Sequence, residues 1–62
     1  MERFDYKLCR SYDKAEAAIE DMFAIGEIDN SDQPRIERRF YPGRAVWYAV
    51  SLLGMDRPNA KF

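Results

Sequence analysis

The chain of 62 residues contains no histidine and a single cysteine, Cys9. Without histidine, neither a Ser-His nor a Cys-His catalytic pair can form, and the Cys9 thiol has no imidazole to activate it. One cysteine also excludes an intrachain disulfide, and it cannot by itself build a thiolate zinc site. We therefore expect the chain not to be an enzyme, and to bind neither a metal nor a cofactor.

Glycine is scarce, and long apolar runs are absent. The three glycines stand at positions 26, 43 and 54, each where a turn or a helix end explains it, so the chain has no glycine-rich phosphate loop. The longest apolar stretch, residues 45–53, is interrupted by Ser51 and is too short to span a bilayer. The first six residues carry charges where a signal peptide has an apolar run. Together with the lone thiol, these absences predict a cytoplasmic protein without membrane contact.

Charge is abundant in the sequence and unevenly distributed. Residues 1–33 carry four cations and nine acids, whereas residues 34–62 carry six cations and two acids. The overall net charge of −1 gives no molecule-wide footprint for nucleic acid or a membrane, so any such binding has to be local. The basic half centres on residues 35–48, where arginines and aromatic residues surround a central Pro-Gly pair.

Helical spacing of apolar residues predicts one amphipathic helix over residues 12–25. Ser11 is placed to cap its N-terminus, and Gly26 to end it in a left-handed turn. A polar, acidic connector follows over residues 27–33, and Pro34 favours an extended backbone at the residue before it. The apolar stripe of the helix comprises Tyr12, Ala15, Ile19, Met22 and Phe23.

Three other segments have the composition of strands. Residues 3–9 alternate between apolar and polar positions, which places Phe4, Tyr6 and Leu8 on one side of a half-buried strand and Asp5, Lys7 and Cys9 on the other. Residues 35–41 and 45–53 predict a β-hairpin around Pro42-Gly43. Burial favours an odd-length loop, because that register gathers the apolar side chains of both strands on one face. That face then comprises Ile36, Phe40, Val46, Tyr48, Val50 and Leu52.

These elements predict a small α+β domain over residues 1–62, in the order strand, helix, β-hairpin, with the helix packed on one face of the sheet. We expect residues 54–62 to form a loosely held tail. A chain of this length has a thin core, so we also expect a homodimer. The predicted core comprises Phe4, Tyr6, Leu8, Ala15, Ile19, Met22, Phe23, Ile36, Phe40, Val46, Tyr48, Val50 and Leu52.

The second face of the hairpin is the candidate binding surface. In the predicted register Arg39 lies across from Trp47, within reach of a cation–π contact. Interface hot spots favour Trp, Tyr and Arg. Arg39, Tyr41 and Trp47, together with Arg35 and Arg44, therefore predict a surface that binds a protein partner.

Two other roles for the basic hairpin stay open. Arg35, Arg38, Arg39 and Arg44 could contact the phosphates of a nucleic acid while the neighbouring aromatic rings stack on unpaired bases. The same arginines could instead pair with the acids of residues 13–32, which would give them a purely structural role.

The polar side of the helix carries Asp13, Glu16, Glu20 and Asp21. Carboxylates this close can perform acid–base chemistry or hold a hard metal, but a solvated helix face is the simpler interpretation. A third interpretation is that these acids imitate phosphates and occupy a basic groove on another protein.

Together these features predict a non-enzymatic protein-interaction module, such as an accessory or inhibitory protein of a mobile element that binds a larger protein or a nucleic-acid-handling machine. The alternative is a small nucleic-acid-binding protein that uses the hairpin.

Overall fold

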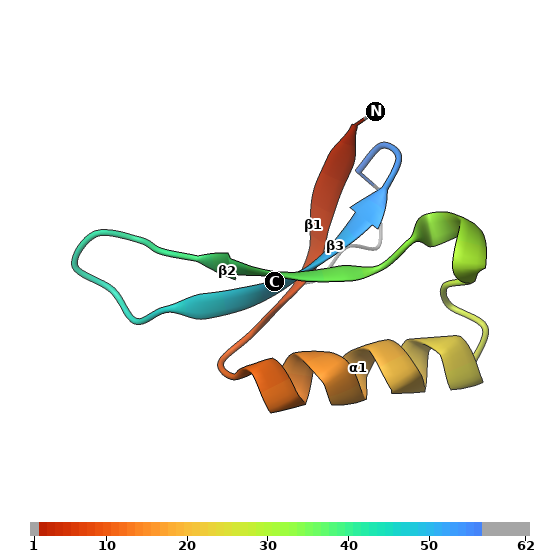
Figure 1. Ribbon diagram of the computed structural model, residues 1–62, viewed down its shortest axis with the longest axis horizontal. Helices are drawn as coiled ribbons and strands as arrows, with labels where there is room; N and C mark the ends of the chain where they lie inside the picture. The colour runs from red at the N-terminus through yellow and green to blue at the C-terminus, as the bar shows by residue number, and fades with distance from the viewer. Residues whose placement is uncertain (1, 57–62) are drawn as a thin grey trace.

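Three antiparallel strands and one helix make up residues 2–56, the part of the chain that the computed structural model describes. The elements are β1 (Arg3–Cys9), α1 (Tyr12–Ala24), the short 3-10 helix η1 (Asn30–Asp32), β2 (Arg35–Arg39) and β3 (Trp47–Leu53). The strands lie in the order β1-β3-β2, and α1 runs along one face of the sheet (Figure 1). The predicted α+β order and the placement of the helix are confirmed. Most of the predicted tail, residues 57–62, lies outside the described residues.

Both ends of α1 are closed as the sequence predicts. The Ser11 hydroxyl accepts a hydrogen bond from the Lys14 amide at 3.2 Å. At the other end the Glu27 amide donates to the Met22 carbonyl at 2.8 Å, and Gly26 adopts a φ of 77°. This pattern is a Schellman motif, which satisfies carbonyls that the helix leaves without a partner.

The buried side of α1 differs from the predicted stripe. Ala15, Ala18 and Met22 are buried, whereas Tyr12 and Phe23 are 50% and 38% exposed. The two alanines let the helix approach the sheet closely, and this rotates the larger aromatic residues to the flanks. The prediction that Phe23 belongs to the core is therefore wrong.

A β-bulge in β1 changes which of its side chains face the helix. The pairing of β1 with β3 shifts between Asp5 and Lys7, so Tyr6 is an extra residue on its strand. Tyr6 is buried against α1, and after the bulge Cys9 enters the core at 8% exposure. Leu8 turns to the opposite face. The predicted alternation is therefore wrong for Lys7, which lies on the same side as Tyr6, and for Leu8 and Cys9.

The hairpin has the register that burial favoured. Ile36 pairs with Val50 and Arg39 pairs with Trp47, which leaves residues 40–46 as an odd-length loop. Both strands are shorter than predicted at the loop end. Phe40 consequently lies outside the ladder and is 74% exposed, so its assignment to the core is wrong. The loop projects beyond the rest of the molecule as an arm (Figure 1).

The acidic connector is folded, and it closes one end of the core. Ile28 is 3% exposed and packs in the core, while the Asp29 amide donates to the buried Asp32 carboxylate at 2.9 Å. Gln33 adopts a left-handed φ of 45°, so the expected extended backbone before the proline is wrong. The Gln33 carbonyl accepts a hydrogen bond from the Arg3 guanidinium, which ties the connector to β1.

The hydrophobic core lies between α1 and the sheet. Its buried residues are Tyr6, Cys9, Ala15, Ala18, Met22, Ile28, Val50 and Leu52, and Phe4, Ile19, Ile36 and Tyr48 pack against them. Four predicted members stand outside this cluster: Leu8, Phe23, Phe40 and Val46. Sequence analysis missed Cys9, Ala18 and Ile28, since their burial depends on the bulge, on close helix packing and on the folded connector.

Candidate functional site

The Arg39 side chain lies across the face of the sheet that α1 does not cover. Its Nε and one terminal nitrogen donate to the two carboxylate oxygens of Asp5 on β1, at 2.9 and 2.8 Å, and the terminal nitrogen also donates to Glu37 at 2.6 Å. Because β3 lies between β1 and β2, this guanidinium crosses the central strand. The residue beneath, at the level of Glu37, is Ala49, which has no exposed surface.

A second arginine covers the other end of β3. Arg3 donates from Nε to the Ser51 hydroxyl at 3.0 Å and from a terminal nitrogen to the Ser51 carbonyl at 2.9 Å. Ser51 is 1% exposed as a result. We call Arg3 and Arg39 the arginine layer. Ala49 and Ser51, the two small residues on the face of β3 that α1 does not cover, lie beneath this layer.

The electrostatics of Arg39 follow from its partners. The hydrogen bond to Asp5, and after it the one to Glu37, raises the pKa of the guanidinium above its usual value. Both carboxylates come from strands, whereas the sequence suggested acids from residues 13–32 as partners. Arg39 therefore joins the two edge strands, and its charge is locally neutralised.

A different arginine covers the Trp47 ring. The Arg10 guanidinium lies 4.7 Å from the ring centroid of Trp47. The predicted cation–π contact with Arg39 is wrong, because the carboxylates of Asp5 and Glu37 draw the Arg39 guanidinium away. The contact between Arg10, which follows β1, and Trp47 could not be predicted from the residues near either position in the sequence.

An apolar hollow of about 520 Å³ lies where β1 ends beside the hairpin loop. Phe40, which directly precedes the lining residue Tyr41 in the chain, is exposed. We call the lining of the hollow together with Phe40 the hairpin-end surface. A bond from the Arg44 amide to the Tyr41 carbonyl, at 3.0 Å, shapes the loop into a tight turn. The hairpin-end surface comprises Leu8, Phe40, Tyr41, Pro42, Arg44 and Trp47.

The structure brings three of the five predicted partner-binding residues together. Tyr41, Arg44 and Trp47 all line the hollow. Arg35 pairs with Ser51 at the far end of β2, and Arg39 belongs to the arginine layer. Sequence analysis missed Leu8, because only the bulge turns it to this face, and Pro42, which it treated as a turn residue alone.

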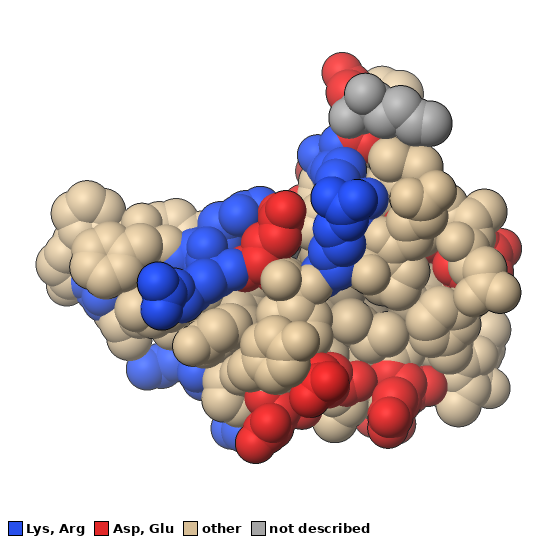
Figure 2. Space-filling model, viewed as in Figure 1, with Lys and Arg blue, Asp and Glu red and all other residues tan. Residues whose placement is uncertain are grey.

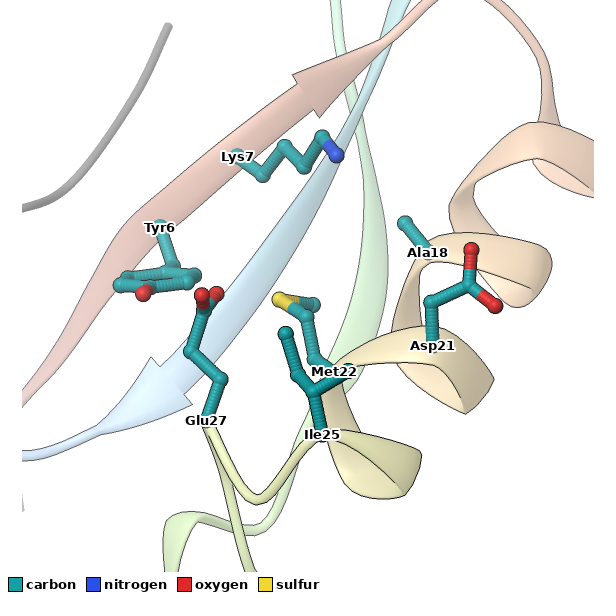
Figure 3. A pocket seen from close by; sticks show the side chains of 7 residues that line it. All are labelled: Tyr6, Lys7, Ala18, Asp21, Met22, Ile25 and Glu27. Carbon is teal, nitrogen blue, oxygen red and sulfur yellow. The ribbon is translucent and has the colours of Figure 1, made fainter.

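A second, smaller hollow of about 170 Å³ lies between the edge of β1 and the end of α1. Side chains from β1, α1 and the connector enclose it (Figure 3). The bulge places Tyr6 and Lys7 there together, opposite the apolar Ala18 and Met22. Its remaining lining residues are Asp21, Ile25 and Glu27.

The charge separation of the sequence persists in space. Asp13, Glu16, Glu20 and Asp21 are all exposed on α1. Figure 2 shows acidic side chains gathered along the helix, while lysines and arginines gather above it, over the sheet and the hairpin. Within residues 2–56 the acids of α1 form no salt bridge with these arginines.

Neither a metal-binding cluster among the described residues nor a similarity to known proteins indicates a function. No three of the histidine, cysteine, aspartate and glutamate residues in the described part of the chain gather closely enough to hold a metal ion. Between residues 2 and 56, no helix is long and apolar enough to cross a membrane. The chain matches no protein-family model, no curated protein and no solved structure at a significant level. Function therefore has to follow from the surfaces themselves.

Proposed function

We propose that this chain is a small non-enzymatic protein-interaction module that contacts its partner through the hairpin-end surface. The observation that supports this most is the apolar hollow lined by Tyr41, Arg44 and Trp47, the three residue types most enriched in interface hot spots. Phe40 adds a ring that is 74% exposed. Large apolar side chains gathered on a projecting loop are typical of protein-binding sites.

One aromatic side chain of this surface, that of Trp47, is already held in place. Trp47 begins β3, where it pairs with Arg39, and the Arg10 guanidinium lies over its ring. The turn at residues 41–44 is closed by its own backbone hydrogen bond. A side chain fixed before binding loses little conformational entropy on association, so more of its contact energy contributes to affinity.

The charges near the surface favour a protein partner over a nucleic acid. Arg39, one of the four arginines that could contact phosphates, is bound to Asp5 and Glu37. The Arg39 charge is therefore already compensated by two carboxylates and adds little attraction for a polyanion. An accessory or inhibitory protein that acts in the cytoplasm fits this size and surface, and a second copy of the chain is the partner if the predicted homodimer forms.

Photo-crosslinking tests the proposal. Phe40→p-benzoylphenylalanine places the crosslinker on the hairpin-end surface, and Phe23→p-benzoylphenylalanine is a matched control on the exposed side of α1. After irradiation in the native host, we expect one discrete protein adduct at position 40 and none at position 23. Adding Trp47→Ala or, as a milder change, Arg44→Glu to the position-40 variant should remove the adduct.

Two results would contradict the proposal. Equal adducts at positions 23 and 40 would show that contact is not specific to the hairpin end. An adduct that persists with both Trp47→Ala and Arg44→Glu would show that the hollow makes no contribution. Circular dichroism of each variant establishes that the fold is retained.

A further inference from the structure

The sheet has two open edges among the described residues. The order β1-β3-β2 leaves β1 and β2 each with a strand neighbour on one side only. The helix lies over a face of the sheet and closes neither edge (Figure 1). An open strand edge presents backbone amides and carbonyls that can pair with a further strand, including the same strand of a second copy. The two edges differ in how well they can do so.

The edge of β1 is protected. The bulge at Tyr6 breaks its regular hydrogen-bonding ladder, and Lys7 is turned toward the same side as Tyr6 (Figure 3). Bulges and inward-pointing charges are two devices by which proteins prevent strand addition. An added strand would have to follow an irregular backbone and displace or bury a lysine.

The edge of β2 is regular. All five residues from Arg35 to Arg39 pair with β3 without a register shift. Arg35 and Arg38 are exposed, and neither forms a salt bridge within the described part of the chain. Ile36 is half-buried and lines a hollow of about 280 Å³ between β2 and α1. The other lining residues of this hollow are Tyr12, Glu16, Ile19, Glu20 and Pro34.

The backbone groups that face the open edge of β2 belong to Ile36 and Arg38. The Gly54 amide, which follows β3, donates to the Glu2 carbonyl in register with the β1–β3 pairing. Because backbone groups alternate in direction along a strand, the even-numbered residues of β3 face β1 and the odd-numbered ones face β2. The β2 residues opposite the odd-numbered ones, whose backbone groups therefore face β3, are Arg35, Glu37 and Arg39.

We propose that β2 pairs antiparallel with β2 of a second copy, in the register that places Ile36 opposite itself. A two-fold axis normal to the sheet makes the residue on the axis face its own copy. Ile36 is the only uncharged residue of β2, so an axis through any other residue sets two like charges against each other. The two Ile36 residues exchange backbone hydrogen bonds, and the ladder ends at Pro34, which has no amide to donate.

This register makes the charges complementary on the face that α1 does not cover. Arg35 of each copy lies opposite Glu37 of the other, because both are one residue from the axis. Opposite charges across an antiparallel pair stabilise it, and the axis repeats the pair. Arg39 bonds to Oε1 of Glu37, so Oε2 can accept from Arg35 of the second copy.

The charges are also complementary on the face that α1 covers. Arg38 of the second copy lies opposite Pro34, at the hollow that Glu16 and Glu20 line. This acidic lining attracts a guanidinium and would repel an acidic segment of another protein. At the axis Ile36 packs against its copy, so the apolar parts of the two hollows meet. The second copy therefore supplies both the apolar and the basic group that this edge accepts.

The hollow at the hairpin end stays free in this dimer. Leu8 lines it from β1, which is the opposite edge of the sheet. With the second copy assigned to β2, the hairpin-end surface remains available to a different protein, so this inference goes beyond the proposed function. A sheet that continues through both copies also compensates for the thin core of so short a chain.

Disulfide trapping tests the register. In a Cys9→Ala background, Ile36→Cys, Glu37→Cys and Arg38→Cys each introduce a single cysteine. Only a residue on the axis faces its own copy, and the Cα separation of about 5.5 Å in a hydrogen-bonded strand pair permits a disulfide. Mild oxidation should link Ile36→Cys into a covalent dimer and leave the other two mainly monomeric. No dimer from Ile36→Cys, or a greater yield from either neighbour, would overturn the inference.

Sedimentation equilibrium of the full chain tests the charge pairs. Arg35→Glu sets two carboxylates opposite each other on both sides of the axis, so it should raise the dimer dissociation constant at least about tenfold. Adding Glu37→Arg restores opposite charges and should return the constant to within about threefold of that of the unmodified chain. The matched control Arg44→Glu, an exposed arginine outside β2, should leave it unchanged.

Two results of this measurement would overturn the inference. One is a chain that stays monomeric up to about 1 mM, and the other is a dimer that Arg35→Glu does not weaken. Circular dichroism establishes that each variant folds. Capture of a different protein at position 40 is an independent readout, so a monomeric chain with that capture intact rejects the dimer and leaves the proposed function standing. A dimer without the capture rejects the proposed function alone.

Discussion

Removing the Asp5 carboxylate tests whether Arg39 holds the edge strands together across β3. The two side chains share two hydrogen bonds, at 2.8 and 2.9 Å, and their exposed fractions are 34% for Arg39 and 27% for Asp5. Exposed ion pairs contribute roughly 0.2–1 kcal/mol, and hydrogen bonds to charged groups roughly 1.5–3 kcal/mol when shielded from water. Discounted for solvent screening, this partly exposed bidentate pair should have a coupling energy of about 1 kcal/mol.

The assay is a double-mutant cycle with Asp5→Ala, Arg39→Ala and the double variant. Urea unfolding followed by Trp47 fluorescence gives the free energy of unfolding of each protein, and the cycle isolates the energy of the pair. The coupling should shrink in about 1 M salt, where the screening length falls to about 3 Å. A coupling below about 0.3 kcal/mol at low salt would refute the claim that this pair joins β1 to β2.

The pH dependence of the Arg39 contribution follows from the sign of its pKa shift. Its pKa is raised in the folded state, chiefly by the hydrogen bond to Asp5. A raised pKa gives stability that is fully present below the unfolded-state value and is lost only as the pH rises through the folded-state value. The pKa of an arginine lies far above neutral pH in both the folded and the unfolded state, so the contribution of Arg39 should not change between about pH 6 and pH 10.

Three further predictions concern the helix end, the arginine layer and nucleic acid. Gly26→Ala should lower the free energy of unfolding by about 1 kcal/mol in urea titrations, because position 26 needs a φ of 77°; an unchanged stability would contradict the Schellman motif. Ala49→Leu should cost about 1–3 kcal/mol in the same assay, since the fully buried Ala49 leaves no room beneath Arg39, and a neutral effect would show that the layer is loose. Trp47 fluorescence should not respond saturably to single- or double-stranded nucleic acid at low salt. Quenching that salt reverses would instead favour the nucleic-acid alternative.

Local signals predicted the parts of the fold that local physics decides. Ser11 and Gly26 mark the ends of α1 because capping depends on residues only a few positions away. The hairpin register followed from burial, since a slip of one residue would exchange the faces of the strands. The pairing of Ile36 with Val50 confirms that reasoning.

Non-local contacts decide the features that sequence analysis missed. The bulge in β1 turns Leu8 to one face and Cys9 to the other, and it exists only because β1 pairs with β3. Arg39 reaches Asp5 because β3 lies between the edge strands, and that order was not predicted. Arg10 stacks on Trp47 for the same reason. The composition therefore identified the aromatic and basic segment, but not which of its members are available to a partner.

The most direct test of the proposed function compares two charge-reversal variants of this chain. The measured quantity is the affinity of each variant for the partner protein that is captured at position 40. Arg44→Glu changes the hairpin-end surface, and Glu20→Lys changes the exposed acidic side of α1. By isothermal titration calorimetry, Arg44→Glu should weaken binding about tenfold, equivalent to about 1.4 kcal/mol, and Glu20→Lys less than about twofold. A loss of affinity with Glu20→Lys and none with Arg44→Glu would contradict the account and identify the acidic helix as the binding surface.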